Sequence, residues 1–124
     1  MADKYIKNPH DSGKVKIAII GAGYVGLVSG ACFSEFGFDV TCVDNDTGKI
    51  AKIAKGLMPI YEPGLENLVM RNVDAGRLHF CTDIGLAVAA ADAVFIAVGT
   101  PTRRGDGHAD LTYVYAAAEE VAVH

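Results

Sequence analysis

Three glycines and one aspartate are the residues of this chain whose types and spacing point most directly to chemistry. Gly21, Gly23 and Gly26 form a G-x-G-x-x-G pattern directly after an apolar run that ends at Ile20. In a strand-to-helix turn, the first glycine allows the tight turn, the second lets the backbone approach a pyrophosphate, and the third lets the helix pack closely on the strand. Asp44 follows Gly26 by 18 residues, where a carboxylate accepts hydrogen bonds from ribose hydroxyls. This pattern predicts a dinucleotide-binding site.

The elements that would hold this site alternate along the chain between short apolar runs and helical segments. The runs predict four strands, at residues 15–20, 38–43, 77–81 and 93–98. Helices are expected behind the glycine turn up to Gly37, from an Asp46 N-cap to Gly56, from Pro63, from an Asp83 N-cap to Ala90, and over 111–123 after an Asp110 N-cap. This alternation favours an α/β fold, a partial Rossmann-type doubly wound parallel sheet of about four strands in the order 3-2-1-4. The last strand is apolar throughout, which is typical of a central strand.

Helical periodicity also predicts which side of each helix faces the sheet. In the helix behind the glycines, the buried face is expected to carry mostly Val25, Val28, Ala31, Cys32, Glu35 and Phe36. In the last helix, it is expected to carry Val114, Ala117, Ala118 and Val121.

Composition limits the classes of protein to which the chain can belong. Its 124 residues, 51% of them hydrophobic and 21% charged, predict one folded domain at most. The net charge of −4 argues against nucleic acid as a partner. Four glycines interrupt the uncharged run 17–33, so we interpret it as protein interior rather than a membrane span and expect a cytoplasmic location. Residues 1–14 are expected to be a flexible leader before the domain at 15–124.

Two further groups of residues have side chains that can react or bind a metal. Cys32, Cys42 and Cys81 have no C-x-x-C spacing and lie within predicted helices or strands, which is typical of small buried side chains in a reducing compartment. The alternating residues Asp106, His108 and Asp110 could suggest a metal site, but a polar loop followed by an Asp110 N-cap explains the same residues without any metal. We therefore expect no metal site.

Three motifs give the chain a family resemblance over residues 15–124. Residues 21–27 read GAGYVGL, residues 59–65 read PIYEPGL, and residues 98–102 read VGTPT. In this order they resemble the UDP-glucose 6-dehydrogenase family, which belongs to a wider group with GDP-mannose and UDP-N-acetylmannosamine dehydrogenases. Tyr61 in the middle motif and the loop 102–107 look most like the UDP-glucose branch.

The resemblance implies an NAD-dependent, two-step oxidation of the sugar C6 alcohol to a carboxylate, with a nucleotide sugar as the substrate of the full-length enzyme. The positions that match the family's contacts to NAD are Gly21, Gly23, Tyr24, Val25, Gly26, Asp44, Lys49, Val98, Thr100 and Pro101. The family's nucleophilic cysteine, lysine, asparagine and glutamates lie far downstream, and none of the three cysteines matches that nucleophile. We therefore expect this chain to bind the ADP half of NAD and to be inactive alone.

Two alternatives remain open at this point. One is a stand-alone NAD- or nucleotide-binding regulatory module, and the other is the NAD-binding part of a GDP-mannose or UDP-N-acetylmannosamine dehydrogenase. Self-association is also expected. Without a fifth strand, the run 93–98 would form a sheet edge, and it contains neither lysine nor proline to discourage pairing.

Overall fold

A parallel sheet forms the middle of the computed structural model, which describes residues 13–124. Within that range the strands β1 (Lys16–Ile20), β2 (Asp39–Val43), β3 (Leu78–Cys81) and β4 (Ala93–Ile96) lie in the order β3-β2-β1-β4. The helices are α1 (Tyr24–Glu35), α2 (Thr47–Ala54), α3 (Leu65–Asp74), α4 (Ile84–Ala90) and α5 (Thr112–Ala122). The predicted Rossmann-type order is confirmed. Most of the predicted leader, residues 1–12, lies outside the described residues.

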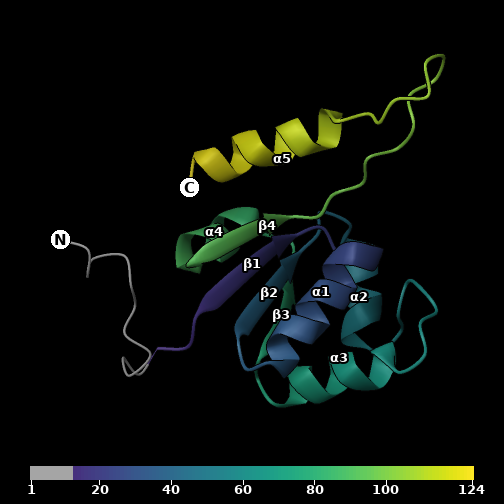
Figure 1. Cartoon of the computed structure of the whole chain (residues 1–124). Helices are drawn as coiled ribbons and strands as arrows, with labels where there is room; N and C mark the ends of the chain where they lie inside the picture. Colours follow the sequence, from purple (N-terminus) through teal and green to yellow (C-terminus); the bar gives the residue numbers. More distant parts are fainter. Residues whose placement is uncertain (1–12) are drawn as a thin grey trace.

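The side chains of β1 explain why its sequence is apolar throughout. Successive residues of a strand point to opposite faces of the sheet. Ile17 and Ile19 belong to a hydrophobic cluster with residues of α1, α2 and α3, whereas Ala18 and Ile20 belong to a second cluster with residues of α4 and α5. Figure 1 shows these two sets of helices on opposite sides of the sheet. Since both faces of β1 are covered, neither can be polar.

The face of α1 that packs on the sheet agrees only in part with the one that periodicity predicts, since Ala31 is buried and Val28 packs against the core. Its buried residues are Gly26, Leu27, Gly30, Ala31 and Ser34. Val25 and Phe36, which were expected on the buried face, are 64% and 77% exposed. A Cβ added at Gly30 would lie only 2.6 Å from Cys42 Sγ on β2. The close approach of helix and sheet therefore requires small residues at every buried position of α1 except Leu27.

Two of the predicted helix starts are confirmed. The Asp46 side chain accepts a hydrogen bond from Lys49 N–H at the start of α2, and the Asp83 side chain accepts one from Leu86 N–H at the start of α4. Each carboxylate thus satisfies a backbone donor that the first helical turn leaves free. The predicted stop Gly56 also directly follows Lys55, the C-cap of α2, and has φ of +84°.

The other two predicted helix starts are wrong. Pro63 lies before α3 and not in its first turn, because Gly64 is the N-cap and adopts a left-handed φ of +84°. Leu111 is the N-cap of α5, while the Asp110 carboxylate accepts a hydrogen bond from Thr112 N–H. In both places local turn geometry delays the helix by one or two residues, which pattern alone does not predict.

A polar network fastens α1 to α3 and to the start of β3. Asn72 is fully buried on α3. Its amide nitrogen donates to Glu35 Oε2 at 2.8 Å and to Leu68 O at 2.9 Å, and its amide oxygen accepts from Arg77 Nε at 3.0 Å. The hydrogen bonds from Asn72 and then Arg71 lower the pKa of Glu35 below its usual value. Because every hydrogen bond of this amide is internal, the network determines how the three elements meet.

The predicted strand 93–98 lies at the edge of the sheet and is shorter than expected. β4 pairs with β1 alone among the described strands, and Phe95 and Ile96 are 46% and 38% exposed. Among the described strands β4 therefore forms the sheet edge that was expected for this run without a fifth strand, although its apolar composition is typical of a central strand. The last ladder bond joins Ala97 N–H to Ile20 O, after which the chain leaves the sheet.

In the described range 13–124, no helix is long and apolar enough to cross a membrane.

Replacing Asn72 tests whether the network stabilises the fold. We expect Asn72→Ala to lower the free energy of unfolding by about 3 kcal/mol, because it removes three part-buried hydrogen bonds and the volume of a fully buried side chain. Urea unfolding followed by circular dichroism measures the change. Asn67→Ala, at an exposed position of the same helix, is the matched control and should change stability by less than about 0.5 kcal/mol. Equal stability of the two variants would contradict the prediction.

Candidate functional site

The glycine turn joins β1 to α1 with no space for side chains at two of its positions. Gly21 has φ of +110°, and a Cβ there would lie 2.5 Å from Ala97 O. A Cβ at Gly26 would lie 1.8 Å from Gly21 O. Gly23, the N-cap of α1, has nothing within 4 Å of its added Cβ. The first and third glycines are therefore required by the fold, while the second faces open space in front of the free N–H groups of α1.

Asp44 lies directly after β2 and reaches back to the glycine turn. Its Oδ2 accepts hydrogen bonds from Ala22 N–H and from Lys49 Nζ, both at 3.0 Å, and its Oδ1 accepts one from Asp46 N–H at 3.0 Å. Burial raises the pKa of Asp44, but the hydrogen bonds from Asp46, Ala22 and Lys49 together lower it by more. The carboxylate therefore stays ionised at neutral pH, held beside the turn as a hydrogen-bond acceptor.

A cleft of about 500 Å³ lies at the carboxyl ends of the strands, and its lining includes Gly21 and Gly23 of the turn together with Asp44 and Lys49. In open α/β sheets ligands bind at this edge. The residues that line the cleft are Ile20, Gly21, Gly23, Val43, Asp44, Asn45, Lys49, Thr82, Ile84, Ala97, Val98, Gly99, Tyr113, Ala116, Ala117 and Glu120. Apolar walls with a few polar groups, in a volume of this size, are typical of small-molecule sites.

The structure brings five of the ten predicted cofactor-binding residues into this cleft: Gly21, Gly23, Asp44, Lys49 and Val98. Gly26 is buried directly behind the turn. Tyr24, Val25, Thr100 and Pro101 are exposed and are not among the residues that line the cleft. Lys49 and Asp44, which lie five positions apart in the sequence, form an ion pair at the wall of the cleft.

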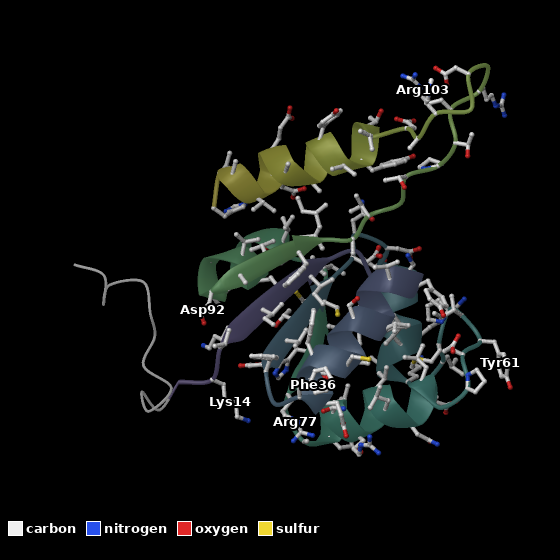
Figure 2. All side chains as sticks on the ribbon, in the orientation of Figure 1. Lys14, Phe36, Tyr61, Arg77, Asp92 and Arg103 are labelled. Carbon is white, nitrogen blue, oxygen red and sulfur yellow. The ribbon has the colours of Figure 1, made fainter. Side chains whose placement is uncertain are left out.

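Tyr24 connects the glycine turn to the loop between α2 and α3. Its hydroxyl donates to Glu62 Oε2 at 2.9 Å, and this contact raises the pKa of Tyr24. Tyr61, the neighbouring residue of the PIYEPGL motif, is 91% exposed and extends away from the sheet (Figure 2). Two of the motifs that resemble the dehydrogenase family thus meet in space through one hydrogen bond.

Sequence reasoning missed the wall of the cleft that α5 and the β3–α4 connection supply. Thr82 and Ile84 follow the third strand at its carboxyl end, so the rule that selected Asp44 after the second strand would have indicated them. Tyr113, Ala116 and Glu120 carry no such local signal, because the connection that precedes α5 decides where this helix lies. The predicted face of α5 is right at Ala117, which is buried, whereas Ala118 is exposed.

The three cysteines and the loop that contains Asp106 do not line the cleft. Cys42 is buried in β2, and burial raises the pKa of its thiol to about 12. Cys32 and Cys81 are half-buried, and all three thiols are free. In the loop before α5, the Asp106 carboxylate pairs with Arg103 and accepts a hydrogen bond from His108 N–H. Among the described residues, no group of three or more His, Cys, Asp or Glu side chains could hold a metal ion.

The chain is similar in sequence to bacterial dehydrogenases over nearly its whole described length. A UDP-glucose 6-dehydrogenase of Rhizobium meliloti is 66% identical over 110 residues, which cover 89% of this chain and 25% of that protein. The UDP-glucose 6-dehydrogenase TuaD of Bacillus subtilis is 55% identical over 109 residues, covering 88% of this chain and 23% of that protein.

Solved structures agree with the sequence similarity. A UDP-glucose dehydrogenase from Pyrobaculum islandicum superimposes with a TM-score of 0.84 at 43% identity, covering 93% of this chain and 26% of that one. A GDP-mannose dehydrogenase from Pseudomonas aeruginosa superimposes with a TM-score of 0.80, also at 43% identity, covering 85% of this chain and 24% of that one.

The chain spans about a quarter of the length of these relatives. The match falls on the segment that carries the glycine turn, Asp44 and the cleft. Residues 15–124 match the NAD-binding domain of one known family over almost the whole described range. The chain therefore belongs to the UDP-glucose/GDP-mannose dehydrogenase family, of which it carries the NAD-binding domain.

Proposed function

We propose that this chain binds the ADP-ribose half of NAD in the cleft at the carboxyl ends of its strands. The observation that carries the proposal is the position of Asp44, whose carboxylate hydrogen-bonds to Ala22 within the glycine turn and to Lys49. A pyrophosphate would bind at Gly23, where the backbone faces open space. The ribose hydroxyls would donate to Asp44, with Lys49 beside it. When bound, NAD supplies the hydride acceptor for an oxidation.

For the whole enzyme we propose the activity of a UDP-glucose 6-dehydrogenase. Such an enzyme oxidises the C6 alcohol of the sugar to a carboxylate with two molecules of NAD, and water supplies the second oxygen. Two relatives with that name, at 66% and 55% identity, support this choice of nucleotide sugar. We assign no catalytic residue to this chain. The buried Cys42 thiol, with its raised pKa, is the opposite of an activated nucleophile.

A pair of glycine substitutions tests the proposed pyrophosphate site. Gly23→Ala should leave stability unchanged because no atom lies within 4 Å of the added Cβ. It should weaken ADP-ribose binding by about tenfold or more, because the methyl group occupies the space the pyrophosphate needs. Gly26→Ala should instead lower the free energy of unfolding by about 3 kcal/mol, because its Cβ meets the backbone. Isothermal calorimetry and urea unfolding measure the two effects. Undiminished binding by Gly23→Ala would refute the proposed site.

Cofactor choice gives a second prediction. The 2′-phosphate of NADP would lie against the Asp44 carboxylate, and like charges repel strongly in a partly buried site. NAD should therefore bind more tightly than NADP by about tenfold or more, and Asp44→Ala should reduce this ratio. Asp39→Ala removes the same charge at the opposite end of β2 and should leave the ratio unchanged. Equal affinity of the unaltered chain for both cofactors would contradict the assignment of Asp44.

We also propose that the chain self-associates through the outer edge of β4. This strand pairs only with β1 among the described strands, and it carries no charged residue or proline. Ala93→Lys should reduce self-association in sedimentation experiments by placing a charge on the exposed edge. Ala89→Lys adds the same charge at an exposed position of α4 and should have no effect. A monomeric unaltered chain at all concentrations would exclude this proposal.

A further inference from the structure

One face of α5 forms a wall of the cleft. Tyr113, Ala116, Ala117 and Glu120 all line it. Their spacing of three, four and seven residues is that of a single helical face. Figure 1 shows α5 lying beyond β4 and α4 on the side of the sheet away from α1. This helix contributes one tyrosine, two alanines and one acid to a site whose other residues lie mostly at and just after the ends of the strands.

The position of Glu120 along the cleft follows from what surrounds its helix. Ala117 belongs to the same hydrophobic cluster as Ile84, at the start of α4. One turn beyond Glu120, the His124 ring lies so close to Gly85 that an added Cβ would come within 2.9 Å of it. The C-terminal half of α5 therefore lies over the start of α4. Glu120 accordingly faces the end of the cleft that Thr82 and Ile84 line, which follows β3.

The order of the strands assigns this end of the cleft to the base of the nucleotide. The glycine turn follows β1, Asp44 follows β2 and Thr82 follows β3, and these strands are neighbours in that order. A nucleotide with its pyrophosphate at the glycine turn and its ribose at Asp44 extends its base further in the same direction. The base would then lie between the β3–α4 connection and the C-terminal half of α5.

The chemistry at that end is apolar except for a few polar groups. Ile84, Ala116 and Ala117 offer surfaces on which a purine ring can pack. The Glu120 carboxylate adds a negative charge to a site that takes a diphosphate. This charge costs affinity unless the carboxylate meets a hydrogen-bond donor of the ligand. The exocyclic N6 amino group is the donor that adenine presents, beside ring nitrogens that only accept.

We propose that Glu120 determines the base specificity of the site by accepting a hydrogen bond from the N6 amino group of adenine. The inference rests on the proposed binding of ADP-ribose in this cleft and adds the residue that recognises the base. A site that makes such a bond rejects a ligand without the donor, because the carboxylate is then left desolvated and unpaired.

Two ligands that differ only at C6 test the assignment: ADP, and purine riboside 5′-diphosphate, which carries hydrogen in place of the amino group. The unaltered chain should bind ADP about tenfold more tightly than the analogue. Glu120→Ala should bring this ratio close to one. Glu119→Ala is the matched control, because Glu119 is exposed and charged as Glu120 is but does not line the cleft. Calorimetry measures all six affinities, and thermal unfolding verifies that the variants fold.

The ratio of the two affinities is the deciding quantity, since a general loss of charge or stability changes both ligands alike. A ratio near tenfold that falls only in Glu120→Ala supports the inference. A ratio that Glu120→Ala leaves unchanged, or a ratio near one in the unaltered chain, overturns it while the proposed function stands. Failure of the unaltered chain to bind either ligand would refute the proposed function, and this inference with it.

Discussion

At the turn after β1, backbone packs directly against backbone, and the remaining structure depends on this contact. The Cα of Gly26 lies so close to Gly21 O that a Cβ would come within 1.8 Å of the oxygen, and Gly21 in turn lies against Ala97 O. This contact brings the first turn of α1 onto the end of β1 and the segment after β4 alongside. The free N–H groups of α1 are thereby held at the carboxyl edge of the sheet, where an anion can accept hydrogen bonds from them.

The Asp44 carboxylate is the electrostatic counterpart of this turn. Donors from three different places in the fold, namely Ala22, Asp46 and Lys49, hold its two oxygens in position. The Asp46 side chain also caps α2, and that cap places Lys49 in the first turn of the helix. The Asp44 carboxylate is therefore held in one orientation by the protein itself, and a preorganised acceptor of this kind reduces the entropy that binding of a hydrogen-bond donor must overcome.

The two faces of the sheet are built differently, and the cleft lies on the looser side. On one face, small residues of α1 approach β2 closely, and the Asn72 network fastens α3 to α1. On the other face, α5 contributes Ala117 as its buried residue and is otherwise half-buried or exposed. A helix that contacts the core only through Ala117 and the half-buried Val121 leaves room beneath it. In this structure that room forms part of the cleft.

The sequence by itself determined the fold class, the strand order, the glycine turn and the position of Asp44 at the end of the second strand. These features depend on local patterns: an apolar strand, glycines at positions that exclude a Cβ, and a carboxylate at the end of the next strand. Tertiary structure decided the buried face of α1, the true starts of α3 and α5, and the wall that Thr82, Ile84 and α5 add to the cleft. Each of these depends on distances between elements far apart in the chain, and such distances leave no periodic signal in the sequence. Glu120 is the clearest case, because only the packing of α5 over α4 turns an ordinary helical acid toward the site.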